Sequence, residues 1–421
     1  MEDLKAGDCI SDLPESIIET ILTLLPIRDA VRTCILSSKW RYRWTTLPDL
    51  VFDDRCLSMY NDGKLEQHSF IKFVTRVLLL HQGPINKFQL ATSFWQCYPD
   101  IDQWVLFLSR GDIKELILEL GEGKWYKVPA RLFNCNKLTQ LELIRCELDP
   151  PPAFKGFSWL KGLSLHQVSI APEAIESLIS SCPLLERLLL SYFDSLSLNV
   201  RAANLKFLYL EGEFRDICLE HTPLLVTVSV AMYMTDDNTE YFEQSSSCSF
   251  IKFLGGVPHL ERLTGQIDFT KYLSIGDYQG IRPITFSYLK VIELYEVSFE
   301  DTKEMLVVLR LITNSPHLKE IQISGSSNAA AITEAPNLDF WATIFPKDCT
   351  FRHLKVVKMT DMSGVPHEME FIKFLLASSP VLEMMSIALS LYVRDRRLSM
   401  LIELLQFRRA SAQAAIFFMQ D

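Results

Sequence analysis

Leucine and other apolar residues recur along most of this chain in one short pattern. The phrase L-x-x-L-x-L, with Val, Ile or Met replacing some leucines, begins at residues 138, 160, 185, 205, 225, 260, 289, 318, 354 and 382. The version at 260–265 is degraded, and a related phrase, IKELILEL, occupies residues 113–120. Alternating apolar positions predict short β-strands with one buried face. The preceding leucine would close the turn into each strand.

Helix-like runs stand before several of these strands. Residues 174–181, 249–256, 304–315 and 370–379 are apolar segments with helical character, and a proline that cannot continue a helix closely follows each of them. A single strand-and-helix unit cannot bury its own apolar face, so neighbouring units must stack. Steps of 20 to 36 residues between the phrases are typical of leucine-rich repeats. We therefore expect an α/β fold, an irregular leucine-rich-repeat solenoid shaped as a horseshoe over residues 113–348, with insertions at 232–250 and 325–348.

Residues 8–48 have a helical pattern instead. Pro14 suits a first helical turn, and Glu15 stands three residues after Asp12, which is the capping-box spacing. Five apolar residues then recur at helical steps up to Pro26: Ile17, Ile18, Ile21, Leu22 and Leu25. A second helix should carry Ala30, Val31, Cys34 and Ile35 on one face, and a short third should present Trp40 and Trp44. The pattern predicts three helices around one small core, with some apolar side chains left for a partner.

This order of residues resembles an F-box. The matching positions are Leu13-Pro14, Ile21-Leu22, Leu25-Pro26, Ile27, Asp29-Ala30, Ser37-Ser38-Lys39-Trp40-Arg41 and Trp44. The resemblance implies docking on a Skp-type adaptor, and through it on a cullin/RING ligase of the SCF class, while the rest of the chain captures a target protein. Residues 27–47 carry five basic residues against one acidic residue, which favours an acidic partner. The sequence does not separate core from adaptor-binding roles among nine candidates: Leu13, Pro14, Ile18, Leu22, Leu25, Ile27, Val31, Ile35 and Trp40.

Two further segments flank the repeats. Residues 49–112 are expected to form a helical linker, with amphipathic helices in 70–82 and 99–111. Residues 349–421 resemble an FBD domain in three stretches, 351–364, 368–387 and 405–418, and that domain accompanies F-boxes and leucine-rich repeats in many plant proteins. The pattern of this last segment predicts two more strand-and-helix units and a closing strand near 414–420.

The strand positions between and just after the inward leucines are the candidate target-binding residues. In a horseshoe these positions face the concave side. They are Gln140, Glu142, Ser164, His166, Arg187, Tyr209, Glu211, Thr227, Ser229, Glu293, Tyr295, Glu320 and Gln322.

Composition and charge exclude some classes of binding partner. A net charge of −10 and a pI of about 5.4 argue against nucleic acid and anionic membranes, which need a basic face. We expect no signal peptide, and the sequence contains no run of eighteen uncharged apolar residues. Its ten cysteines contain no C-x-x-C pair and indicate reduced thiols. We expect an intracellular protein, in cytoplasm or nucleus.

The sequence contains no catalytic constellation that supports an enzyme. GEGK at 121–124 lacks the earlier glycine of a phosphate loop and a following Ser or Thr, and the eight histidines never pair at i, i+4. We therefore predict a non-catalytic protein without a metal or cofactor, serving as the target-recognition subunit of a ubiquitin ligase. One alternative is an interaction scaffold that uses the repeats without ubiquitin transfer. Another is an enzyme whose site is assembled only by the fold.

Overall fold

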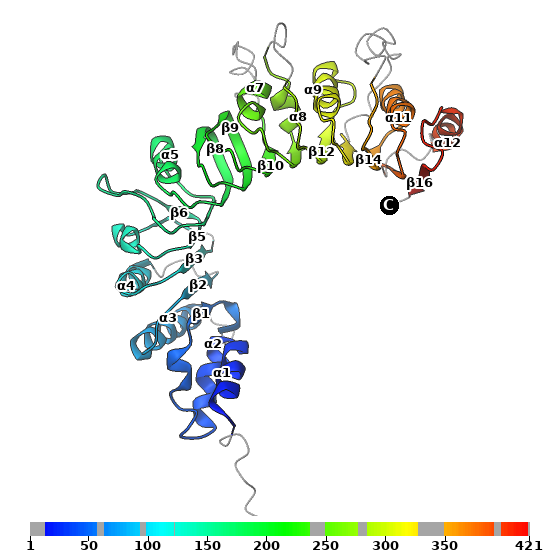
Figure 1. Ribbon diagram of the computed structural model, residues 1–421. Coiled ribbons are helices and arrows are strands. Elements are labelled where there is room, and N and C mark those ends of the chain that lie inside the picture. Colours follow the sequence, from blue (N-terminus) through cyan, green and yellow to red (C-terminus); the bar gives the residue numbers. More distant parts are fainter. Residues whose placement is uncertain are drawn as a thin grey trace, which may run out of the picture. The chain divides into compact units, whose positions relative to one another are not determined.

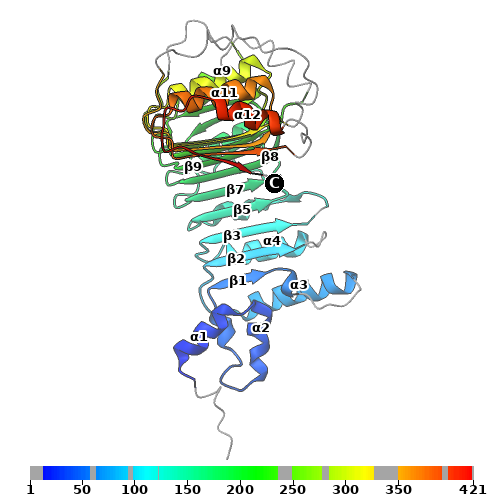
Figure 2. The ribbon, with the colours of Figure 1, turned by 90° about the vertical axis from the view of Figure 1, so that its right-hand side faces the viewer.

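The computed structural model describes residues 13–56, 63–92, 98–121, 123–235, 249–276, 284–326, 349–390 and 397–419. The chain forms two compact units, Met1–Leu189 and Leu190–Asp421. Parallel strands stack side by side within each unit, and helices lie along one side of them (Figures 1 and 2). The horseshoe expected for the whole array stays a prediction.

A small helical module opens the first unit. Helix α1 (Glu15–Leu24) starts directly after Pro14, as expected, while Asp12 of the predicted capping box lies outside the described residues. Helix α2 (Ile27–Arg32) is shorter than expected and continues as a 3₁₀ turn, η1 (Thr33–Ile35). In place of a third α-helix, the structure has turns and a second 3₁₀ segment, η2 (Arg43–Thr46). Trp40 and Trp44 are both buried in the small core that results.

The rest of the first unit is a parallel sheet with its covering helices. Its strands are β1 (Asp49–Phe52), β2 (Lys87–Thr92), β3 (Glu115–Leu120), β5 (Gln140–Ile144) and β7 (Gly162–His166), with a small separate pair, β4 (Tyr126–Lys127) and β6 (Cys146–Glu147). Its other helical segments are η3 (Asp54–Cys56), α3 (Gly63–Leu80), α4 (Tyr98–Leu108), η4 (Ala130–Asn134) and α5 (Pro172–Ser180). Strand β8 (Arg187–Arg201) begins at the end of this unit.

The second unit repeats the same plan. Its strands are β9 (Phe207–Glu220), β10 (Thr227–Met232), β11 (Arg262–Ile267), β12 (Val291–Val297), β13 (Glu320–Gly325), β14 (Val356–Met362), β15 (Met384–Leu389) and β16 (Ala415–Met419). From β9 to β16 each strand pairs in parallel with the next. The helices are α7 (Ser249–Leu254), α8 (Phe269–Leu273), α9 (Thr302–Thr313), α11 (Pro366–Ser378) and α12 (Arg397–Gln406).

The leucine phrases fix where the strands begin. Each of the ten phrases from residue 138 onward is followed by a strand that starts two residues after its first leucine. That leucine is at most 1% exposed in every case: Leu138, Leu160, Leu185, Leu205, Leu225, Leu260, Leu289, Leu318, Leu354 and Leu382. The predicted strands are confirmed, and so are the helices α5, α7, α9 and α11 before the prolines.

Two repeats differ from the simple plan. Strands β8 and β9 are 15 and 14 residues long, whereas the phrases predict only short strands. The phrases at 185, 205 and 225 are 20 residues apart, which leaves little chain for a helix, and the strand alternation instead continues past the phrase. On β9 this continuation buries Phe214, Ile217 and Leu219.

A left-handed residue marks the end of the repeat phrase on several strands. Among the described residues, seven non-glycine residues have φ of 53–61°, and all but His221 lie five positions after the first residue of their strand: Arg145, Gln167, Tyr192, Ile267, Glu296 and Asp361. Gly212 occupies the same place on β9, with φ of 143°. This conformation is unfavourable for a side chain, and its recurrence indicates that a sharp bend is needed at the end of the repeat phrase.

The flanking segments also belong to the strand arrays. Residues 49–112, expected to be a helical linker, contain α3 and α4 but also β1 and β2, and β2 pairs in parallel with β3. The described part of 349–421 consists of β14, α11, β15, α12 and β16, which matches two strand-and-helix units and a closing strand. Most of the predicted insertions, residues 236–248 and 327–348, lies outside the described residues.

Two buried glutamates tie helices to the strands before them. Glu304 and Glu368 are each the third residue of their helix, α9 and α11. Glu304 accepts hydrogen bonds from the Thr270 hydroxyl at 2.7 Å and the Ser298 N–H at 3.4 Å. Glu368 accepts from the N–H groups of Ser363 and Gly364 at 2.9 and 2.7 Å. The carboxylates therefore satisfy loop N–H groups that would otherwise be buried without acceptors.

We expect Gly212→Ala to lower the free energy of unfolding by about 2 kcal/mol or more. A Cβ there would lie 2.4 Å from the Phe193 carbonyl oxygen, besides the unfavourable φ. Gly162→Ala is the matched control, because its Cβ would meet nothing nearer than the Gln140 side chain at 3.7 Å. Urea titration of both variants checks this, and equal midpoints would contradict it.

We expect Glu368 to make stability depend on pH. Burial raises the pKa of this carboxyl from 4.5 to about 7, and nearby Glu300 adds to the effect. The folded state thus holds the proton more tightly, so its contribution is complete below pH 4.5 and disappears as pH rises through 7. As the pH rises from 4.5 to above 7, the free energy of unfolding of the wild type should fall by about 3 kcal/mol relative to that of Glu368→Gln.

The measurement for Glu368 is urea unfolding at several pH values, with Glu370→Gln on the same helix as the control. A constant difference between the wild type and Glu368→Gln over this range would show that the carboxyl does not titrate there.

Candidate functional site

The helical module divides its apolar residues into a core and an exposed set. Four of the nine candidate adaptor residues are buried: Ile18, Leu22, Ile27 and Trp40, each at most 3% exposed. Leu13, Leu25 and Val31 are half-buried, and Pro14 and Ile35 are exposed. The buried four can support a partner's binding only through the fold, whereas the other five reach the surface.

Ile35 shows why the sequence could not separate these roles. A continuous α-helix would have placed it beside Val31 on the inner face, but the chain tightens into a 3₁₀ turn at Thr33. A 3₁₀ turn has 3.0 residues rather than 3.6, so the side chain rotates outward. Ile35 is 83% exposed as a result.

The structure adds four exposed apolar residues that the sequence did not single out as partner-binding. They are Ile17, Leu24, Leu36 and Tyr42, with exposures between 45% and 80%. Ile17 and Leu24 lie seven residues apart on α1, on a stripe next to the one that carries Ile18 and Leu22. Ile17 belongs to the broad apolar stripe that the spacing predicts, whereas Leu24 lies outside it.

Hydrogen bonds connect the end of the helical module to residues 81–86, the segment between α3 and β2 in the first repeat. The N–H of Gln82 donates to the Thr45 carbonyl at 2.9 Å, and Nε2 of His81 lies 2.8 Å from the Leu47 carbonyl oxygen. The N–H of Asn86 donates to the Pro48 carbonyl at 2.7 Å. The end of the module is thereby held against the loop that follows α3.

The second candidate surface is the side of each sheet opposite the buried leucines. The thirteen predicted target-binding residues all lie on this strand face or at its edge, and each is half-buried or exposed. In the first unit the register sets Glu142 beside Ser164, and His166 beside Ile144. In the second unit it sets Tyr209 beside Ser229, and Glu293 beside Gln322. The strands thus align residues from successive repeats in rows.

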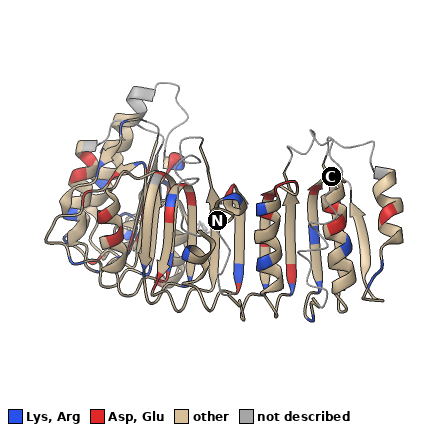
Figure 3. Ribbon diagram, turned by 90° about the horizontal axis from the view of Figure 1, so that it is seen from above, with Lys and Arg blue, Asp and Glu red and all other residues tan. Residues whose placement is uncertain are grey.

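Charges of both signs lie along the strands (Figure 3), and several are paired across neighbouring strands. Arg262 donates to Glu293, which also accepts from the Thr264 hydroxyl at 2.9 Å. Lys358 donates to Glu320 at 2.7 Å. In the first unit, burial raises the pKa of Glu142, and the neighbouring Glu119 adds to this. Partly exposed pairs of this kind contribute little stability, and they occupy part of the face.

One carboxylate on the strand face is held by phenols instead of a base. Glu211 accepts hydrogen bonds from the Tyr209 hydroxyl at 3.0 Å and the Tyr233 hydroxyl at 3.2 Å. Burial is the main cause that raises the pKa of Tyr209 to about 12, and the nearby Glu211 carboxylate adds to it. The same two causes raise the pKa of Tyr233. Both phenols therefore stay protonated at neutral pH and can keep donating to Glu211.

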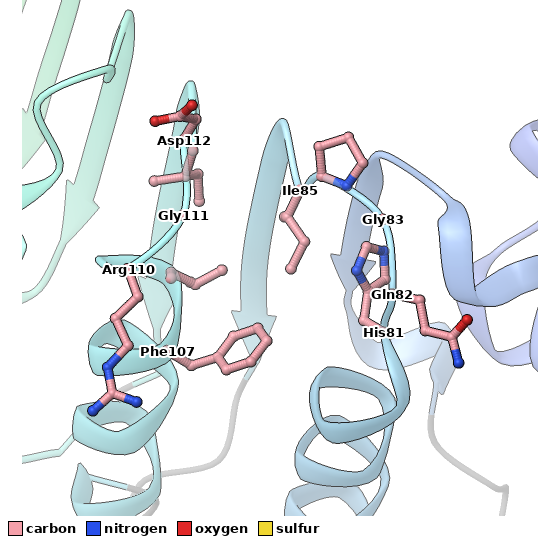
Figure 4. Close-up of a pocket in the computed structure, with 11 residues that line it drawn as sticks. His81, Gln82, Gly83, Ile85, Phe107, Arg110, Gly111 and Asp112 are labelled. Atoms are coloured by element: carbon pink, nitrogen blue, oxygen red, sulfur yellow. The ribbon is translucent and has the colours of Figure 1, made fainter.

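A pocket of about 310 Å³ lies in the first unit where the loops after α3 and α4 face each other (Figure 4). Ile85 and Phe107 point into it, while His81 comes from one loop and Arg110 and Asp112 from the other. Its centre is apolar and its titratable groups stand on different walls, so the pocket fits an apolar group better than a catalytic step.

The described residues offer no group of three or more His, Cys, Asp or Glu side chains that could hold a metal ion. Nor does any helix among them have the length and apolar character required to cross a membrane. His259 and His317, which occupy the same slot of the repeat phrase, are surface residues next to aromatic rings. His259 packs on Tyr288 and His317 on His353, with ring centres 4.8 and 5.2 Å apart.

Comparison with known proteins agrees with all three parts of the chain. A family model for the F-box domain matches residues 10–52, and one for the FBD matches residues 346–387. A third, described as FBD-associated F-box protein At5g56370, LRR repeats, matches residues 101–323.

Curated relatives from Arabidopsis thaliana cover the chain from end to end. F-box/FBD/LRR-repeat protein At1g13570 is 59% identical over 417 residues, spanning 99% of this chain and 100% of the relative. F-box/FBD/LRR-repeat protein At3g26920 is 26% identical, covering 99% of this chain and 98% of its own length. The chain belongs to the plant F-box/FBD/LRR-repeat protein family.

Proposed function

We propose that this protein is the target-recognition subunit of an SCF-type ubiquitin ligase. The observation that carries the proposal is an F-box match over a module whose surface exposes several large apolar side chains. Exposed apolar groups of this number on so small a module favour burial by a partner. A Skp-type adaptor would be that partner, and it would connect the chain to a cullin/RING ligase.

In this proposal the two sets of apolar residues have different roles. Ile18, Leu22, Ile27 and Trp40 form the core that shapes the module, and Pro14, Ile17, Leu24, Ile35 and Tyr42 supply contacts to the adaptor. The basic residues Arg32, Arg41 and Lys39 are exposed beside them and would favour an acidic adaptor surface.

The outward strand rows would hold the target protein. The repeats would form a solenoid that presents these rows as a continuous surface. The hydrogen bonds that fasten the module to the first repeat support this role, because a fixed attachment raises the local concentration of target lysines near the ubiquitin carrier. The protein itself would carry out no chemical step.

The proposal places the protein inside the cell, in the cytoplasm or the nucleus. Seven described cysteines are free thiols, and three of them, Cys135, Cys146 and Cys182, are buried. Free thiols of this kind are typical of a reducing compartment.

We expect Ile35→Glu to weaken adaptor binding by about tenfold or more, because it places a charge where an apolar contact is proposed. The folding stability should stay unchanged, since the side chain is 83% exposed. Leu79→Glu is the matched control, because Leu79 is 75% exposed on α3, outside the module. Binding of the purified full chain to a plant Skp-type adaptor, by calorimetry, measures the effect.

A substitution at a buried position separates the residues that shape the core from those that contact the adaptor. Ile18→Ala should lower the free energy of unfolding by about 2–5 kcal/mol and weaken binding through the fold. If Ile35→Glu binds the adaptor as well as the wild type does, the assigned contact surface is wrong.

We expect reversal of several outward carboxylates, Glu142, Glu293 and Glu320 to Lys together, to abolish target capture. The fold and adaptor binding should persist, since these positions lie on the strand face and partly exposed ion pairs add little stability. The measurement is the set of proteins captured from plant extract by the wild type and the variant, followed by the half-lives of captured proteins in cells with and without this chain.

The same experiment tests the scaffold alternative. Captured proteins whose half-lives do not change when this chain is removed would indicate binding without ubiquitin transfer. Unaltered capture by the triple variant would show that the strand face is not the target-binding surface.

A further inference from the structure

One part of the strand face in the second unit differs from its surroundings. Elsewhere on this face, acidic residues such as Glu293 and Glu320 are paired with Arg262 and Lys358. Glu211 forms no ion pair among the described residues, and its hydrogen bonds come from two neutral phenols. Its negative charge is thus uncompensated by a base, on a partly exposed sheet face.

The two phenols hold the carboxylate in one orientation. Tyr233 donates to Oε1 and Tyr209 to Oε2, so each oxygen is fixed by one hydrogen bond. A carboxylate oxygen can accept a further hydrogen bond, so both keep capacity for an incoming donor. A carboxylate oriented before binding loses less conformational freedom when a ligand arrives.

Aromatic side chains lie at this carboxylate. Tyr209 and Tyr233 contact it through their hydroxyls, and Tyr192 interacts electrostatically with both phenols. Tyr192 is 48% exposed and occupies the left-handed corner after the first part of β8. We name Tyr192, Tyr209, Glu211 and Tyr233 the tyrosine patch. The faces of tyrosine rings attract cations, and the effect is strongest where water is partly excluded.

The neighbours of the patch leave it accessible and negative. The register sets Ser229 beside Tyr209 and Ala231 beside Glu211, and both are small. Glu296, another left-handed corner residue, also acts on the Tyr233 phenol. The patch therefore combines one oriented carboxylate, Glu211, with aromatic rings, and the negative charge of Glu296 adds to the field at Tyr233, so that the site complements a cationic group.

We propose that the tyrosine patch binds a lysine or arginine side chain on an extended segment of the target protein. The ammonium or guanidinium would donate to Glu211 in a charge-assisted hydrogen bond while the tyrosine rings surround it. This inference rests on the proposed function, in which the strand face captures a target, and adds the chemical class of residue that it selects. Acidic segments would be repelled by the same carboxylates.

The test uses the purified full chain and immobilised peptide libraries with randomised flanks. Their fixed central residue is Lys, Arg, Nε-acetyl-lysine or Glu. We expect the Lys and Arg libraries to retain about tenfold more protein than the acetyl-lysine library, which keeps the side-chain length but lacks the charge. The Glu library should retain the least.

Three variants assign the preference to the patch. Glu211→Gln keeps the shape and removes the charge, so it should abolish the preference for Lys and Arg. The double variant Tyr209→Phe, Tyr233→Phe keeps the rings but releases the carboxylate, so it should reduce the preference partially. Glu173→Gln, an exposed carboxylate on helix α5 of the first unit, is the matched control and should bind like the wild type. Thermal melting of each variant verifies its fold.

Several outcomes would overturn the inference. They are equal retention of lysine and acetyl-lysine libraries, a preference that survives Glu211→Gln, and a preference for the Glu library. Adaptor binding and target half-lives, measured on the same variants, keep the two proposals apart. If the wild-type chain prefers lysine peptides but does not bind the adaptor, only the ligase function is contradicted. Intact target degradation by Glu211→Gln would contradict only the patch.

Discussion

The burial of one leucine row along a parallel sheet is the constraint on which this structure depends. A strand-and-helix unit of 20 to 36 residues has too little interior of its own, so it is stable only when its apolar side chains pack against those of adjacent units. The first leucine of each phrase and the two inward strand positions provide that contact. The strands must therefore stay in register, and the outward residues of successive repeats follow in rows about 4.8 Å apart.

This arrangement decides where function can reside. The inward positions are occupied by the core, so partners meet the outward rows and the corners at the strand ends. The left-handed residues at these corners project side chains at the edge of the face. Arg145 donates to Gln167 in the first unit at 2.8 Å, and Ser324 donates to Asp361 in the second at 2.7 Å. The left-handed backbone thus recurs in seven of the described strands, where the chain bends at the end of the repeat phrase, and the side chains there lie at the edge of the face.

The N-terminal module is too short to bury all of its apolar side chains. Its core consists of a handful of buried side chains, among them Trp40 and Trp44. The remaining apolar residues lie on the surface, and the polypeptide attaches directly to the first repeat through His81 and Gln82. A small core with an apolar exterior is suited to a module that is completed by a partner.

The sequence by itself determined that a strand phrase repeats along the chain and where those strands begin, because these follow from local periodicity and from prolines. It also identified which strand residues face outward, since alternation is a property of any strand. The tertiary structure alone decided the exposure of Ile35 and the meeting of Tyr209 and Tyr233 at Glu211. The first depends on a change of helical pitch. The second depends on contacts between residues about twenty positions apart, which no local pattern encodes.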